Sequence, residues 1–238
     1  METGRRTPAG PPAAQGPERL AALAWAPPVA TLLFYTLPEP LRQSRPIQFL
    51  PQLLAYLCLV LWAGRHGDWV ARLGLTPSRW PQGLRWGLMT GLLLGIFNTA
   101  VILRLVPALG GDIQFLRETP HAQAPLLLML PWTITLIAVG VELNFRGFLL
   151  GRLLALWQPP PGSRYHPWGA ALAVAVSALT FSFDPFMVAT FRHLHWIAVW
   201  DGLVWGILWV RLANLYAPIV AHTVEVVIMY SVLKAVLG

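Results

Sequence analysis

Two short patterns of ionisable residues interrupt the apolar second half of this 238-residue chain. Glu142 and Arg146 are four positions apart, and His222 and Glu225 are three apart, so each pair shares one face if its segment is helical. An ionisable side chain at the centre of a membrane helix costs about 2.5–3.5 kcal/mol on insertion scales, so such residues commonly mark function. A carboxylate beside an imidazole is suited to activating water, and the same residue types can carry protons.

Further polar side chains lie in or beside apolar runs. His193 and His195 are two positions apart, a spacing that lets both face one site only in a loop. Asp201 lies in an apolar run and needs a partner, and Asn98 is predicted to link two helices by hydrogen bonds. Each of these residues also has a purely structural explanation. Glu142 and Arg146 could simply neutralise each other within a helix, His222 could be a packing residue, and His193 and His195 could lie at the membrane interface.

The elements that must position these residues are predicted from composition. Hydrophobic residues make up 56% of the chain and charged residues 11%, less than half of the charge of a typical soluble domain. A membrane helix needs ~20 apolar residues, and no run has the period of two that a barrel strand requires. We therefore expect an all-α, polytopic transmembrane helical bundle of about seven segments, at residues 20–37, 47–64, 84–108, 125–150, 168–183, 195–212 and 215–237.

Residues 1–19 are rich in proline, glycine and alanine, which predicts a disordered cytoplasmic tail ahead of a membrane domain at 20–238. The arginines behind the net charge of +7 are spread singly through the loops, which favours membrane topology over nucleic-acid binding as its cause. The loop at 65–83 carries three arginines against one aspartate, whereas the loop at 109–123 carries one arginine against two acidic residues. This asymmetry predicts a cytoplasmic N-terminus.

Small residues also recur every four positions, as at Gly87, Gly91 and Gly95. This spacing is typical of membrane helices whose backbones approach closely. We also expect Glu142 and Arg146 to form an ion pair that faces the bundle interior near His222.

Three segments are similar to short motifs, each with one altered position. They are Glu-Glu-x-x-x-Arg at 141–146, with Val141 for the first glutamate; Phe-x-x-x-His at 181–185, with Pro185 for the histidine; and His-x-x-x-Asn at 222–226, with Val226 for the asparagine. A literal Phe-x-x-x-His occurs ten residues later, at 191–195. Together these motifs resemble those of the CPBP family of intramembrane proteases, which includes the CAAX prenyl endopeptidases, and the resemblance covers a core at residues 125–238.

The resemblance implies an endopeptidase that is an integral protein of the bacterial cell membrane, the inner membrane where there are two. Its substrate would be a membrane-associated protein or peptide, cleaved by water that glutamate and histidine activate. Glu142 would be the base or a metal ligand, Arg146 would orient it, and His222 would polarise the carbonyl or the water. The candidate catalytic residues are Glu142, Arg146, His222 and His195, with His193, Asp201 and Glu225 as supporting residues.

Cofactor and activity stay open in this interpretation. Zinc could be held by Glu142, His195 and His222, whereas a metal-free mechanism agrees equally well with the resemblance. The altered motif positions leave an inactive family member, acting as a membrane-bound sorting or assembly factor, as the alternative. A small ion-coupled transporter is the third hypothesis.

The topology can be tested by cysteine labelling. Cysteines introduced at residues 10 and 115 should react with a membrane-impermeant reagent from opposite sides, because three predicted segments separate the two positions. The unmodified chain, whose single cysteine Cys58 lies in an apolar run, supplies the background. Labelling of both positions from the same side would contradict the topology.

Overall fold

The computed structural model describes residues 18–157 and 167–237, and within these ranges the regular structure is entirely helical. The predicted all-α class is therefore confirmed. The predicted tail at 1–19 lies outside the described residues, apart from its last two positions. The α-helices are α1 (Ala26–Phe34), α2 (Glu39–Arg42), α3 (Arg45–Gln48), α4 (Leu50–Ala63), α5 (Trp69–Arg72), α6 (Trp80–Ala100), α7 (Val106–Ala108), α8 (Pro120–Gln123), α9 (Leu126–Leu128), α10 (Ile134–Glu142), α11 (Gly151–Leu156), α12 (Pro167–Ser182), α13 (Pro185–Phe191), α14 (Ile197–Leu212) and α15 (Tyr216–Leu237).

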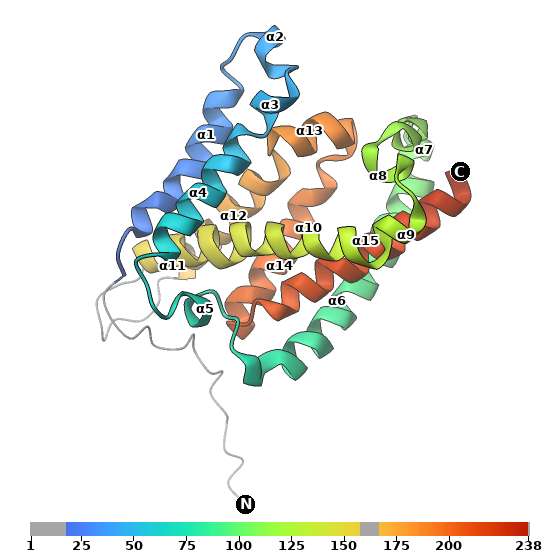
Figure 1. Ribbon diagram of the computed structural model, residues 1–238. Helices are drawn as coiled ribbons and strands as arrows, with labels where there is room; N and C mark the ends of the chain where they lie inside the picture. The colour runs from blue at the N-terminus through green and yellow to red at the C-terminus, as the bar shows by residue number, and fades with distance from the viewer. Residues whose placement is uncertain (1–17, 158–166, 238) are drawn as a thin grey trace, which may run out of the picture.

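Tighter and wider helical turns join several of these helices. Narrow 3₁₀ turns lie at Ala21–Trp25, Pro77–Arg79, Gln114–Glu118 and Arg192–Leu194, and wide π turns at Val101–Leu105, Met129–Thr133 and Leu143–Leu150. Figure 1 shows three helix pairs, α1 with α4, α12 with α14 and α6 with α15, around the stretch that runs from α10 to α11.

All seven predicted apolar runs contain helix, but they differ in length. Within the described ranges, Trp69–Ala108, Ile134–Leu156 and Tyr216–Leu237 are long and apolar enough to cross a membrane. A pair bent by 54°, Trp168–Ser182 with Pro185–Leu194, would make a fourth crossing if it counts as one span. The apolar helices Ala21–Phe34 and Leu50–Ala63 are shorter. The helical membrane bundle is thus confirmed, with three or four crossings by length and composition among the seven predicted runs.

One proline breaks a predicted run, and another begins the short helix that follows a run. Leu130 takes an extended conformation (φ −106°, ψ 128°) immediately before Pro131, because a residue that precedes proline is disfavoured in the helical region. The run predicted at 125–150 therefore becomes a continuous helix only from Ile134. Asp184 ends the α12 segment and caps α13, accepting hydrogen bonds from the backbone N–H groups of Phe186 and Met187, while Pro185 occupies the first position of α13.

Helices α6 and α15 lie against each other, as Figure 1 shows in green and red. Glycines of α6 form the contact. A Cβ atom at Gly87 would come within 2.7 Å of the Ala217 carbonyl oxygen, and one at Gly91 within 2.6 Å of the Ala221 carbonyl oxygen. Only glycine permits this approach. The close packing predicted from the four-residue spacing is confirmed.

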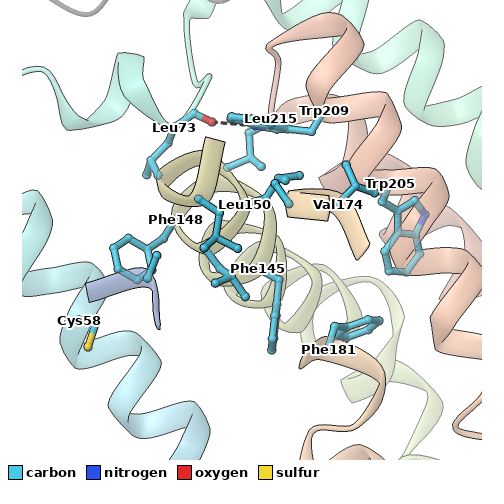
Figure 2. Close-up of a cluster of buried hydrophobic side chains, with 14 of the residues drawn as sticks. Cys58, Leu73, Phe145, Phe148, Leu150, Val174, Phe181, Trp205, Trp209 and Leu215 are labelled. Carbon is cyan, nitrogen blue, oxygen red and sulfur yellow. Dashed lines mark hydrogen bonds between the residues drawn. The ribbon is translucent and has the colours of Figure 1, made fainter. Parts of the chain in front are cut away.

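The apolar core surrounds the wide-turn segment Leu143–Leu150. Figure 2 shows Phe145, Phe148 and Leu150 projecting from this segment in different directions, with Phe181 beside Phe145. Because every residue from 144 to 150 is buried, the segment lies inside the bundle on all sides. The charged residues at its beginning are therefore removed from both water and lipid.

An ionic cluster fixes the start of the described chain. One oxygen of Glu18 accepts hydrogen bonds from Trp62 Nε1 at 2.8 Å and Arg152 Nη1 at 3.0 Å, and the other accepts one from Arg72 Nη1 at 2.8 Å. The chain is thus anchored at residue 18, two positions before the predicted start of the membrane domain.

The structure also refines the cysteine-labelling experiment. Phe115 is buried, so the neighbouring exposed Gln114 is the better labelling position in the loop at 109–123.

The glycine contact predicts the effect of one added methyl group. Gly91→Ala should destabilise the protein by about 1–3 kcal/mol, because the new Cβ would meet a backbone oxygen that can retreat only if the helices separate. The measurement is the melting temperature in detergent. Gly67→Ala is the matched control, since nothing lies within 4 Å of a Cβ at that position. An unchanged melting temperature for Gly91→Ala would contradict the packing argument.

Candidate functional site

Glu142 and Arg146 form the predicted ion pair inside the bundle. Arg146 Nη1 donates to Glu142 Oε1 at 3.1 Å, and both side chains are 0% exposed. Glu142 is the last residue of α10, and Arg146 lies in the wide-turn segment that continues it. Burial of two charges is tolerated only when each finds a partner, which is what the four-residue spacing provides.

Aromatic rings enclose the rest of the Arg146 guanidinium. Its carbon lies 4.7 Å from the centroid of the Phe181 ring and 5.0 Å from that of Trp205, distances at which a cation is attracted to a ring face. Its Nε and Nη2 groups are buried and have no hydrogen-bond partner in the described part of the chain. Arg146 thus retains unused hydrogen-bond donors.

His222 approaches the same carboxylate from α15. Its Nδ1 lies 2.9 Å from Glu142 Oε1, and its ring stacks on Trp205 with centroids 4.3 Å apart and planes 20° apart. A carboxylate accepts, so this contact favours the tautomer with hydrogen on Nδ1 and leaves Nε2 as the proton acceptor. The sequence predicted that Glu142, Arg146 and His222 would lie together, and the structure brings all three together.

A second polar network lies between three helices. The amide nitrogen of Asn98 on α6 donates to Asp201 Oδ1 on α14 at 2.9 Å and to Glu225 Oε1 on α15 at 2.7 Å. The amide oxygen of Asn98 accepts from Trp200 Nε1 at 2.8 Å. Asn98 is 0% exposed, so this amide uses its hydrogen-bonding capacity inside the bundle. The predicted role of Asn98 as an interhelical link is confirmed, and Asp201 has the partner it needed.

A cavity of about 690 Å³ lies against both networks. His222, Asp201 and Glu225 line it, whereas Glu142 does not and is fully buried behind His222. Most of the remaining wall is apolar or aromatic, a composition typical of sites for apolar ligands. Val141 and Val226, two of the altered motif positions, lie on this wall, and Pro185 is buried at the start of α13.

Basic side chains line another part of the cavity. Lys234 follows His222 by twelve positions on α15, a separation of about 18 Å along the helix. Its Nζ donates to the carbonyl oxygens of Ala122 and Ala124 at 3.0 and 3.1 Å. His121 also lines the cavity, and burial lowers the pKa of its imidazole, which favours the neutral form.

The remaining predicted histidines separate from each other. His195 lines the cavity, with Nδ1 2.6 Å from the Arg192 carbonyl oxygen and its ring against Phe183. His193 is exposed and packs against Phe115, outside the cavity wall. The orientation of His195 towards Glu142 stays a prediction.

The candidate zinc ligands Glu142, His195 and His222 do not form a metal site. Within residues 18–157 and 167–237, no group of three or more His, Cys, Asp or Glu side chains could hold a metal ion. Glu142 Oε1 already contacts Arg146 Nη1 and His222 Nδ1, so this oxygen has no free position for a metal ion.

Two residues of the site were absent from the sequence-based candidates. Asp184 lines the cavity and accepts a hydrogen bond from Gln52 Nε2 at 2.8 Å, and the Asp-Pro pair at a helix start was the available signal. Trp205 supports the His222 ring, but it stands in a run of tryptophans that composition alone assigns to the membrane interface. No local pattern distinguishes it.

Comparison with known proteins finds one family model that matches part of the chain. Residues 123–228 match the family model described as type II CAAX prenyl endopeptidase Rce1-like, which supports assignment to the CPBP/CAAX protease family. No curated protein and no solved structure gives a significant match to the chain. The matched region contains Glu142, Arg146, Asp201, His222 and Glu225.

The buried ion pair predicts a large effect of removing one partner. Arg146→Ala should destabilise the protein by about 3–5 kcal/mol, because it leaves the Glu142 carboxylate buried without its cation. Melting in detergent measures this loss, with the exposed Arg85→Ala as control and Glu142→Gln as the reverse case. If Arg146→Ala melts at the same temperature as the unmodified chain, the pair does not stabilise the bundle.

Proposed function

We propose, from the assignment of residues 123–228 to the CPBP/CAAX protease family, that this chain is a membrane-embedded endopeptidase in which His222 is the general base. The observation that carries the proposal is the 2.9 Å contact between His222 Nδ1 and Glu142 Oε1 on the wall of the cavity. It leaves Nε2 as the ring nitrogen available to a water molecule in that cavity. Glu142 is a positioning residue in this proposal, because it does not line the cavity.

The proposed hydrolysis begins with a water molecule beside His222. Nε2 takes a proton from the water while its oxygen attacks the carbonyl carbon of a peptide bond in the cavity. The negative charge of Glu142 then stabilises the imidazolium through Nδ1, as a carboxylate behind a catalytic histidine does. Arg146 holds Glu142 in place, and Trp205 fixes the plane of the His222 ring.

The shape and lining of the cavity favour an apolar or lipid-bearing peptide as substrate. A volume of about 690 Å³ falls within the range of small-molecule sites, about 300–1,000 Å³. Membrane-associated proteins present such segments within the bilayer, where this cavity would receive them. The matched family model is described as a type II CAAX prenyl endopeptidase, so a prenylated peptide with a CAAX ending is the first probe to use.

A second candidate function is binding without cleavage. Val141 and Val226 place isopropyl groups on the cavity wall where the family motifs have a glutamate and an asparagine. Valine can neither activate water nor donate a hydrogen bond to a developing oxyanion. An inactive relative with this wall would retain an apolar segment and act as a membrane-bound sorting or assembly factor.

One assay separates the two functions. The purified chain in liposomes is mixed with a farnesylated CAAX peptide that carries a fluorophore and a quencher, and cleavage is read as fluorescence gain. We expect cleavage by the unmodified chain and a decrease of about 10²–10⁴-fold for His222→Gln, the usual contribution of a general base. His193→Gln, outside the cavity, should cleave at the unmodified rate.

Binding of the same probe is measured in parallel through quenching of tryptophan fluorescence, since Trp205 lies on the cavity wall. Binding without any cleavage by the unmodified chain would contradict the peptidase proposal and favour the binding function. Cleavage that is unaffected by His222→Gln would exclude His222 as the base.

A further inference from the structure

The network of Asn98, Asp201 and Glu225 contains two buried carboxyl groups, although a single hydrogen bond would be enough to link two helices. The two carboxyl groups come from different helices, are 4% and 1% exposed, and share one amide nitrogen. Glu225 Oε2 is buried and has no hydrogen-bond partner in the described part of the chain. Two ionised carboxylates held against one amide nitrogen in a buried site would repel each other strongly, so this geometry favours a pair that holds one proton.

The proton-holding pair faces the cavity that His222 faces. Asp201, Glu225 and His222 all line it, and Glu225 follows His222 by three positions on α15, so the two side chains share one face of that helix. The pair therefore offers an acid to a group bound in the cavity, on the same wall as the proposed base.

Arg146 provides a second, independent observation at this site. Its guanidinium is 0% exposed, and Nε and Nη2 have no hydrogen-bond partner among residues 18–157 and 167–237. Nη2 lies 3.2 Å from where a Cβ at Gly202 would be, next to Asp201 in the chain, and the guanidinium is attracted to both Asp201 and Glu225. The donors that Arg146 does not use on Glu142 therefore lie beside the helix that carries Asp201.

We propose that the Asp201–Glu225 carboxyl pair, positioned by Asn98, is the general acid that protonates the leaving amine during peptide hydrolysis. This inference rests on the proposed function. Water adds its oxygen to the carbonyl carbon and gives one proton to His222 Nε2. The C–N bond then breaks as the pair gives its proton to the amine nitrogen, and the proton on His222 returns to the pair through water. The products are one carboxylic acid and one amine, and no other reactant is consumed.

The test compares two probes that differ only in the leaving group. One is the farnesylated CAAX peptide, and the other carries a thioester in place of the amide bond that is cleaved. An amine must be protonated to leave, whereas a thiolate leaves without an acid. We expect Glu225→Gln and Asp201→Asn each to lower kcat/KM for the amide about 100-fold or more, and for the thioester less than about 10-fold.

Controls separate a chemical role from a structural one. Both variants keep the size of the side chain, and Glu39→Gln, an exposed isosteric change, should leave both rates unchanged. His222→Gln should lower both rates together, because the water attacks in either case. Equal losses on the two probes for Glu225→Gln and Asp201→Asn would overturn the acid assignment while keeping His222 as the base. Cleavage of neither probe by the unmodified chain would remove the proposed function and this inference with it.

A measurement on the unmodified chain avoids dependence on variants that fold poorly. The amide rate should fall at high pH as the pair loses its proton, while the thioester rate should not. The charged or titratable groups that surround the pair are Arg146 and Glu142 on the α10 side and His222 on α15. His222 acts on both probes alike, so only the difference between the two profiles reports the pair. Identical profiles would contradict the proposal.

Discussion

The neutralisation of a buried arginine controls the arrangement of this bundle's interior. Arg146 and Glu142 are removed from solvent, and isolated charges in such surroundings would be very costly. Phe181 and Trp205 pack over the guanidinium, which ties α12 and α14 to the Leu143–Leu150 segment. His222 contacts the carboxylate, which ties α15 to the end of α10. The glycine line on α6 then allows α15 to lie close enough for a second network to form.

Contacts within one helix were predictable from the sequence because spacing determines them. The four-residue separation of Glu142 and Arg146 identified the ion pair, and the repeated glycines identified a close helix contact. The helical class followed from run lengths and composition. Run length alone did not distinguish full crossings from shorter helices. Pro131 interrupts the run predicted at 125–150, and Pro185 begins a separate helix after the run predicted at 168–183.

Contacts between helices were predictable only in part. Asn98 lies 103 positions from Asp201 and 127 from Glu225, and no periodicity states which helix faces will meet. The place of His222 beside Glu142 was predictable through resemblance to a family, because motif order implies a shared site. The position of Glu142 behind His222, rather than on the cavity wall, depends on the rotation of one helix and could not be read from residue types.

Glu18 is synthesised long before the last of the groups that hold it. Arg152 follows it by 134 positions, an interval of roughly 7–27 s at ordinary rates of translation, about 5–20 residues per second. During that time the carboxylate can bind Trp62 and Arg72, but it has no arginine from α11. The ionic cluster can close only after the segment with Glu142 and Arg146 has entered the bundle. The first apolar helix is therefore locked late, by a residue that emerges from the ribosome early.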